Sequence, residues 1–174
     1  RRPESVLFMA HACALAINPK GIERPGCGIA SAVLVAPRGR GPRALAWNVS
    51  LMNSPAGRAR HGGDWSDAVA ISDDAFALAI GDVSGHGEPA FGTMEIMRAS
   101  LLSGIRANVD PSEILSAANS VAYSIHDSVI VTAIVAIVNR RLRTLTFANA
   151  GHPAPLMMTP TLHGFLTHAK ADLP

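Results

Sequence analysis

Two helical segments follow one another directly between two groups of strand-like segments, and this order constrains the fold most. From Glu88 the apolar residues recur every three and four positions as far as Ile105, which is typical of an amphipathic helix. Asp110-Pro111-Ser112-Glu113 then begins a second helix with a capping-box pattern and Pro at the first helical position. Consecutive helices argue against alternating βαβ units. We therefore expect antiparallel sheets with helices packed on them.

The strand-like segments lie on both sides of this helical pair. Before it, residues 67–72 and 76–80 form a predicted hairpin around Asp73-Asp74. After it, the β-branched run 129–138 is typical of a buried central strand. The remaining predicted strands are 44–52, 142–148, 155–159 and 162–167.

The composition indicates one domain that buries much of its surface. The chain has 174 residues, of which 48% are hydrophobic and 16% charged. Its net charge of +2 is too small to indicate nucleic-acid binding, despite a sequence pI near 8.9. Several arginines cluster in predicted loops, where they form either a solvated surface or a contact for an acidic or phosphorylated partner.

The first 42 residues contain no motif that points to chemistry. Cys13 and Cys27 have no C-x-x-C spacing and form no disulfide framework, so we expect a cytoplasmic protein. The apolar run 5–17 is too short to span a membrane, and we favour a packed helix or strand over a signal peptide. Because the chain begins with Arg, we expect 1–42 to be an N-terminal extension or linker, following an upstream sensor domain.

Two acidic turns flank the predicted hairpin, and both combine a carboxylate with glycines. Gly62-Gly63-Asp64-Trp65 precedes it, and Gly81-Asp82-Val83-Ser84-Gly85-His86-Gly87 follows it. Opposite ends of one hairpin meet at the same edge of a sheet, so the two carboxylates should converge. Carboxylate pairs of this kind suit Mg²⁺ or Mn²⁺. Taken singly, each turn is better explained by an Asx hydrogen bond; the pair together favours a metal site.

These two motifs precede a third, Phe147-Ala148-Asn149-Ala150-Gly151-His152-Pro153-Ala154-Pro155-Leu156. Together they resemble the metal-dependent protein phosphatase family, type 2C, in its bacterial RsbU/SpoIIE-like branch, over residues 43–174. The resemblance implies an α/β layered fold, a four-layer α-β-β-α sandwich of two antiparallel sheets flanked by helices. It also implies a metal-dependent protein serine/threonine phosphatase. Its substrate would be a phosphorylated regulatory protein, a STAS-type anti-sigma-factor antagonist, hydrolysed by water activated by two Mn²⁺ or Mg²⁺ ions.

The resemblance also implies roles for individual residues. Asp64 would bind one metal, Asp82 would bridge both, and the main-chain carbonyl of Val83 would complete the ligand set. The residues expected to shape the surrounding loops are Gly63, Gly81, Gly85, His86, Asn149, Gly151 and His152.

Other residues near these motifs are assigned from their chemistry and position. Arg58 and Arg60 precede the first acidic turn and are candidates for binding a substrate phosphate, with exposed loop cations as the alternative. We expect Trp65 to pack over the rim of the site and His86 to make a loop-stabilising hydrogen bond. Thr132 lies inside a buried strand and is assigned a structural role.

The sequence departs from the family at its C-terminal end. Members of the branch have further aspartates there, and nothing after His152 matches them. We therefore expect a C-terminally incomplete phosphatase domain with an incomplete metal site. The alternative function is a catalytically silent phosphatase-like module that binds a partner. A nucleotide-binding phosphate loop is disfavoured, because no Lys follows Gly87.

Overall fold

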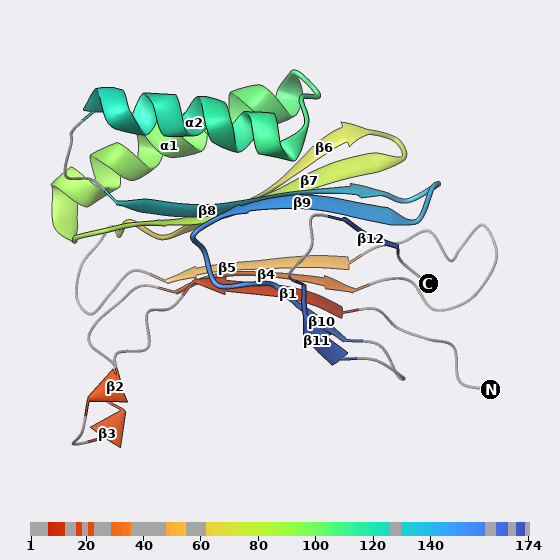
Figure 1. Cartoon of the computed structure of the whole chain (residues 1–174), viewed down its shortest axis with the longest axis horizontal. Helices are drawn as coiled ribbons and strands as arrows, with labels where there is room; N and C mark the ends of the chain where they lie inside the picture. Colours follow the sequence, from red (N-terminus) through yellow and green to blue (C-terminus); the bar gives the residue numbers. More distant parts are fainter. Residues whose placement is uncertain are drawn as a thin grey trace.

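Two five-stranded antiparallel sheets face one another, and a pair of helices covers the outer face of one of them (Figure 1). The structure is a computed structural model. It describes residues 7–12, 17–18, 21–22, 29–35, 48–54, 62–125, 130–158, 163–166 and 170–172.

The sheet beneath the helices has the strand order β12-β9-β8-β7-β6. Its strands are β6 (Trp65–Ser72), β7 (Ala75–Val83), β8 (Val131–Asn139), β9 (Thr144–Ala150) and β12 (Lys170–Asp172). The predicted hairpin is confirmed, since β6 and β7 pair antiparallel around a turn at Asp73 and Asp74. Asp82 lies inside β7 rather than after its end, because the strand continues to Val83.

The second sheet has the order β11-β10-β1-β4-β5. Its strands are β1 (Leu7–Ala12), β4 (Ile29–Val35), β5 (Asn48–Ser54), β10 (Leu156–Met158) and β11 (His163–Phe165). β1 and β4 come from the segment expected to be an extension or linker. They occupy the middle of this sheet, between β10 and β5, so the described strands of that segment share one sheet with later parts of the chain. A short ribbon of β2 (Ile17–Asn18) and β3 (Gly21–Ile22) stands apart (Figure 1).

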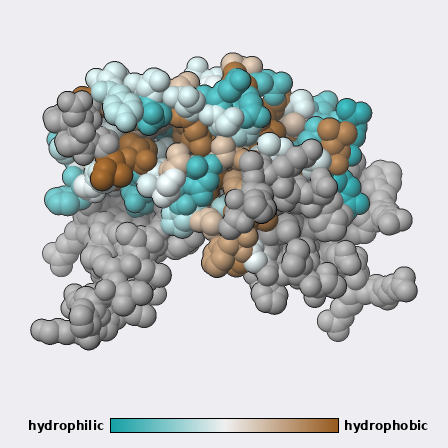
Figure 2. Space-filling model, viewed as in Figure 1, coloured by the Kyte–Doolittle hydropathy of each residue, from teal (hydrophilic) through white to brown (hydrophobic). Residues whose placement is uncertain are grey.

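The two predicted helices are α1 (Gly87–Arg106) and α2 (Pro111–Ile125). The Asp110 carboxylate caps α2, accepting hydrogen bonds from the Ser112 N–H at 2.9 Å and the Ser112 hydroxyl at 2.6 Å. These bonds lower the pKa of Asp110. In the face seen in Figure 2, the described helical layer presents mainly hydrophilic side chains to solvent. Neither helix is long and apolar enough to cross a membrane.

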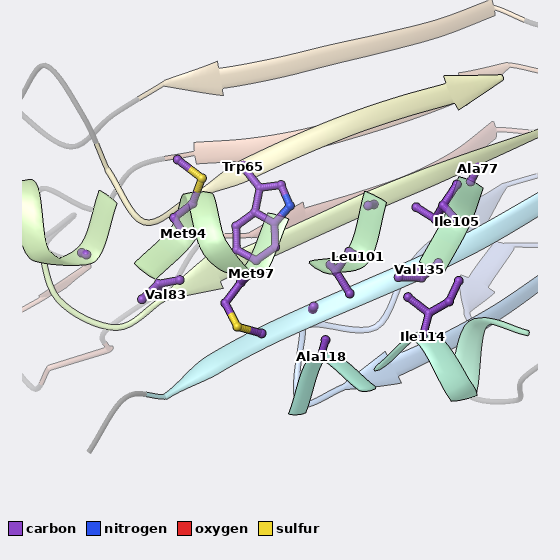
Figure 3. Packing of buried hydrophobic residues seen from close by; sticks show 13 residues of the cluster. Trp65, Ala77, Val83, Met94, Met97, Leu101, Ile105, Ile114, Ala118 and Val135 are labelled. Atoms are coloured by element: carbon purple, nitrogen blue, oxygen red, sulfur yellow. The ribbon is translucent and has the colours of Figure 1, made fainter. Parts of the chain in front are cut away.

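The core forms where alternate residues of the first sheet meet the helices. Ala77 and Ala79 of β7 pack in one buried cluster with Leu101, Ile105 and other residues of α1 and α2 (Figure 3). Leu78 and Ile80, which alternate with these alanines, are buried on the opposite face, toward the second sheet. Large side chains thus fill the space between the sheets, and small ones let α1 approach β7 closely.

The two antiparallel sheets and their helices confirm the layered fold expected from the sequence. Within the described parts of the chain, three of the four expected layers are present, because both helices lie on one side of the sandwich. The arrangement places one end of β6, β7 and β8 beside the start of α1. Asp64 and Asp82, the two carboxylates of the predicted metal site, lie at that end.

Candidate metal centre

Asp64 and Asp82 lie opposite one another on neighbouring strands. Trp65 pairs with Gly81, and the Val83 N–H donates to the Gly63 carbonyl oxygen at 3.2 Å, which extends the ladder by one step beyond β6. Asp64 and Asp82 are the pair between these two contacts. Since Trp65 faces the helices, the two carboxylates project from the opposite face, toward the second sheet.

The two carboxylates destabilise one another's charge. Burial and the negative charge of Asp82 raise the pKa of Asp64 to about 7, and burial also raises the pKa of Asp82. Neither forms an ion pair within the described residues. A divalent cation would neutralise this pair, so oxygen donors of this type fit Mg²⁺ or Mn²⁺. In the part of the chain that the structure describes, no third His, Cys, Asp or Glu joins them.

The pKa of Asp64, raised by burial and by the charge of Asp82, predicts how stability depends on pH in the metal-free protein. Asp64 has a higher pKa in the folded state than the ordinary value of 3.8 for this side chain, so the folded state binds more protons between about pH 4 and 7. Stability from this group therefore falls as the pH rises through that window. Asp64→Asn should exceed the wild-type melting temperature by a larger margin at pH 8 than at pH 5, measured in EDTA by thermal unfolding.

Asp73→Asn is the matched control, because Asp73 is exposed in the turn at the other end of the hairpin. Its melting temperature should differ from the wild type by the same small amount at both pH values. If the gap in melting temperature between Asp64→Asn and the wild type stays constant from pH 5 to pH 8, the pKa of Asp64 is not raised in the folded protein.

Glycines make the close approach of the strands possible at this end. A Cβ at Gly63 would lie 2.3 Å from the Val83 carbonyl oxygen, and one at Gly81 would lie 2.1 Å from Cη2 of Trp65. The predicted position of Trp65 on the rim of the site is wrong. Its side chain is 3% exposed and packs beneath α1 with Met94 and Met97 (Figure 3), because strand alternation turns it away from the carboxylates.

The loop between β7 and α1 bends through two glycines. Gly85 and Gly87 have φ values of +105° and +75°, which L side chains rarely adopt. His86 between them is exposed, and its side chain makes no capping hydrogen bond, so the expected loop-stabilising bond is not found at this cap. Ser84, which sequence reasoning missed, ties the loop to β8. Its N–H donates to the Ile130 carbonyl at 2.9 Å and its hydroxyl accepts from the Ile130 N–H at 3.2 Å.

A second turn closes the same end of the sheet after β9. The Asn149 side chain accepts from the His152 N–H and donates to the His152 carbonyl, both at 2.8 Å, while Gly151 has a φ of +68°. His152 is buried, and its Nδ1 lies 2.9 Å from the hydroxyl of Thr132 on β8. These contacts join residues of three segments near the carboxylate pair.

Two further pairs of charged residues include members near the first acidic turn in sequence, but the structure does not place either pair in the site. Arg58 and Arg60, the candidate phosphate-binding residues, lie outside the described residues. Asp67 on the helix-facing side of β6 forms a bidentate ion pair with Arg98 of α1, with two contacts of 2.8 Å. The sequence shows only an acidic residue in a predicted strand and a basic residue in a predicted helix. That pattern is too weak to predict that the two form an ion pair.

Comparisons with known proteins show the family to which the chain belongs. The family model for stage II sporulation protein E (SpoIIE) matches residues 72–174, and the chain therefore belongs to this family. The resemblance found in the sequence is confirmed. The structure of the RsbU and RsbW domains of Rv1364c from Mycobacterium tuberculosis is 29% identical in sequence to this chain, with a TM-score of 0.57. The match covers 68% of this chain and 38% of that chain.

A second structure shares the fold. The SiaA-PP2C domain of Pseudomonas aeruginosa is 22% identical, with a TM-score of 0.51, over 65% of this chain and 52% of that one. This chain thus spans about half or less of the length of these two neighbours.

Proposed function

We propose that this chain is part of a divalent-metal-dependent protein serine/threonine phosphatase. The observation that carries the proposal is the pair of partly buried, mutually repelling carboxylates, Asp64 and Asp82, in a chain of the SpoIIE family. A buried carboxylate with a raised pKa and no ion-pairing partner among the described residues is typical of a functional site rather than of a stabilising contact.

Asp64, Asp82 and the carbonyl of Val83 would hold two Mn²⁺ or Mg²⁺ ions, with further ligands expected from outside the described residues. Such ions would supply a water molecule of lowered pKa and neutralise the phosphoryl oxygens. The two described carboxylates are too few to hold two cations alone. Activity is therefore expected to depend on further ligands from outside the described residues.

The protein's own residues would bind and orient the phosphate group. α1 begins at Gly87, directly after the site, so its first N–H groups and its dipole favour an anion there. The glycines at positions 63 and 81 keep the strands close, and the Ser84 contacts with Ile130 fix the loop between the carboxylates and the helix. Partial burial lowers the local dielectric and strengthens each of these interactions.

The substrate class is the one that the resemblance to the family implies. We propose a phosphoserine or phosphothreonine on a regulatory protein, a STAS-type anti-sigma-factor antagonist, in the cytoplasm. The likeness to an RsbU domain at 29% identity supports a regulatory protein as substrate. An upstream sensor domain would fit the same kind of regulator.

A catalytically silent module that binds a protein partner is the second candidate. The absence of a third metal-ligating side chain near the pair, among the residues that the structure describes, favours it. Silence would require that the missing ligands do not exist in the longer polypeptide either.

Hydrolysis of a phosphoserine peptide in Mn²⁺ separates the two candidates. The assay compares this chain with the polypeptide extended along its native coding sequence, each with and without EDTA. We expect EDTA-sensitive hydrolysis by the extended polypeptide and weaker activity in this chain. No hydrolysis by either one, with both folded, would favour the binding module.

A further inference from the structure

A third polar residue lies in the same cross-strand row as the two carboxylates. Thr132 of β8 is directly opposite Asp82 of β7. Directly opposed residues in an antiparallel pair have Cβ atoms about 5 Å apart. The neighbours of Thr132 on β8, Val131 and Ala133, pack on the helix side, so Thr132 faces the second sheet as Asp82 does.

The hydroxyl of Thr132 is held in one orientation by His152. Its Oγ1 lies 2.9 Å from Nδ1 of His152, whose side chain is only 5% exposed. The two hydrogen bonds with Asn149 fix the main chain of His152, and Gly151 bridges to Ala133 of β8. Thr132 itself is only partly buried, as is Asp82 opposite it.

The direction of the bond between Thr132 and His152 decides what the hydroxyl can do. A threonine hydroxyl has one proton and two lone pairs, and a neutral imidazole has one N–H. If His152 accepts at Nδ1, the Thr132 proton is used, and only lone pairs remain for the site. If His152 donates from Nδ1, the Thr132 proton is free. A bound phosphate presents only acceptor oxygens, so a hydroxyl that offered it lone pairs alone would repel it, and phosphate binding at Thr132 requires donation from His152.

We propose that His152 carries its proton on Nδ1 and donates it to Thr132, whose hydroxyl then donates to a phosphoryl oxygen bound beside Asp82. Thr132 is thereby a phosphate-binding residue, and His152 is a positioning residue that acts through it. The inference rests on the proposed function for its ligand, but its geometry rests on the register of β7 and β8 and on the contact with His152.

The tautomer of His152 can be measured without any activity. A long-range ¹H–¹⁵N correlation spectrum of the wild-type protein distinguishes protonated Nδ1 from protonated Nε2. His152→Asn identifies the signal by its loss among the seven histidines of the sequence. We expect protonated Nδ1. A protonated Nε2 with unprotonated Nδ1 overturns the inference whether or not the protein is a phosphatase.

Substitution of Thr132 tests the donated hydrogen bond. Thr132→Val keeps the branched shape and removes the hydroxyl, and Thr132→Ser keeps the hydroxyl. With inorganic phosphate as probe in saturating Mn²⁺, calorimetry should give about tenfold weaker phosphate binding for Thr132→Val, since one hydrogen bond to a charged group is lost. Thr132→Ser should stay within about threefold of the wild type. The Mn²⁺ concentration that gives half of the maximal rise in melting temperature should be the same in both variants as in the wild type.

Thr146→Val is the matched control, because Thr146 pairs with Ile137 on the helix-facing side of the sheet, away from the row. Its phosphate affinity should equal that of the wild type. Equal phosphate binding in Thr132→Val and the wild type, or equal weakening in the Ser and Val variants, overturns the inference and leaves a structural threonine. If either of these binding results is found and the wild type still hydrolyses a phosphoserine peptide, the proposed function holds. Phosphate binding that depends on Thr132 without hydrolysis overturns the proposed function alone.

Discussion

Asp82→Asn should lower kcat for a phosphoserine peptide at least about a thousandfold in saturating Mn²⁺, in a polypeptide that shows wild-type activity. Asparagine keeps the size of the side chain but removes the negative charge that would hold the cations. A thousandfold loss corresponds to about 4 kcal/mol of transition-state stabilisation, which is typical of losing a central electrostatic contact. The measurement is steady-state hydrolysis across a range of Mn²⁺ concentrations.

The effect should be separable from stability. Asp82 is partly buried and its pKa is raised by burial, so Asn at this position should not destabilise the metal-free fold. Asp73→Asn, at the opposite end of the same hairpin, should retain wild-type kcat. A variant at Asp82 that retains more than about a tenth of wild-type kcat would show that the carboxylate is not required for hydrolysis.

Gly81→Ala should destabilise the fold by about 3 kcal/mol, because a methyl group is forced into a packed core. The added Cβ would lie 2.1 Å from one ring atom of Trp65 and within 2.6 Å of two others. The indole is enclosed by α1, so relief requires the sheet or the helix to shift. Because Asp82 is the next residue, metal binding should weaken as well. Urea unfolding of the metal-free protein measures the first effect.

Gly92→Ala is the control for the added methyl group. Gly92 lies inside α1, and a Cβ there meets nothing within 4 Å, so the substitution should stabilise the helix by about 0.5–1 kcal/mol. Combining Gly81→Ala with Trp65→Leu should recover part of the lost stability, because the smaller side chain vacates the contact. If Gly81→Ala is as stable as the wild type, the packing of Trp65 on Gly81 is not tight in solution.

Local patterns in the sequence predicted the elements around the site well. The β6–β7 hairpin follows from a two-residue turn between apolar segments, and the start of α2 follows from Asp110 and Pro111. The facing of Asp64 and Asp82 follows from the same hairpin, because antiparallel strands bring their outer ends together. These are short-range consequences of turn chemistry and capping.

Other features could not be predicted because they depend on sheet order. β1 lies between β10 and β4, and its partner β10 is almost the whole chain away in sequence. The contact between Thr132 and His152 joins residues twenty positions apart, and the ion pair between Asp67 and Arg98 joins residues thirty-one apart. Trp65 was wrongly placed on the rim of the site, since the residues before it are two glycines and an aspartate and give no alternation to follow. β12 has three residues and no periodic signal.

The central claim is that Asp64 and Asp82 together bind a divalent cation. Titration with Mn²⁺, followed by electron paramagnetic resonance of the free ion, tests it directly in the wild type and in both Asp→Asn variants. We expect saturable binding by the wild type and at least a tenfold loss of affinity in each variant. Equal Mn²⁺ affinity in the wild type and both variants would contradict the account.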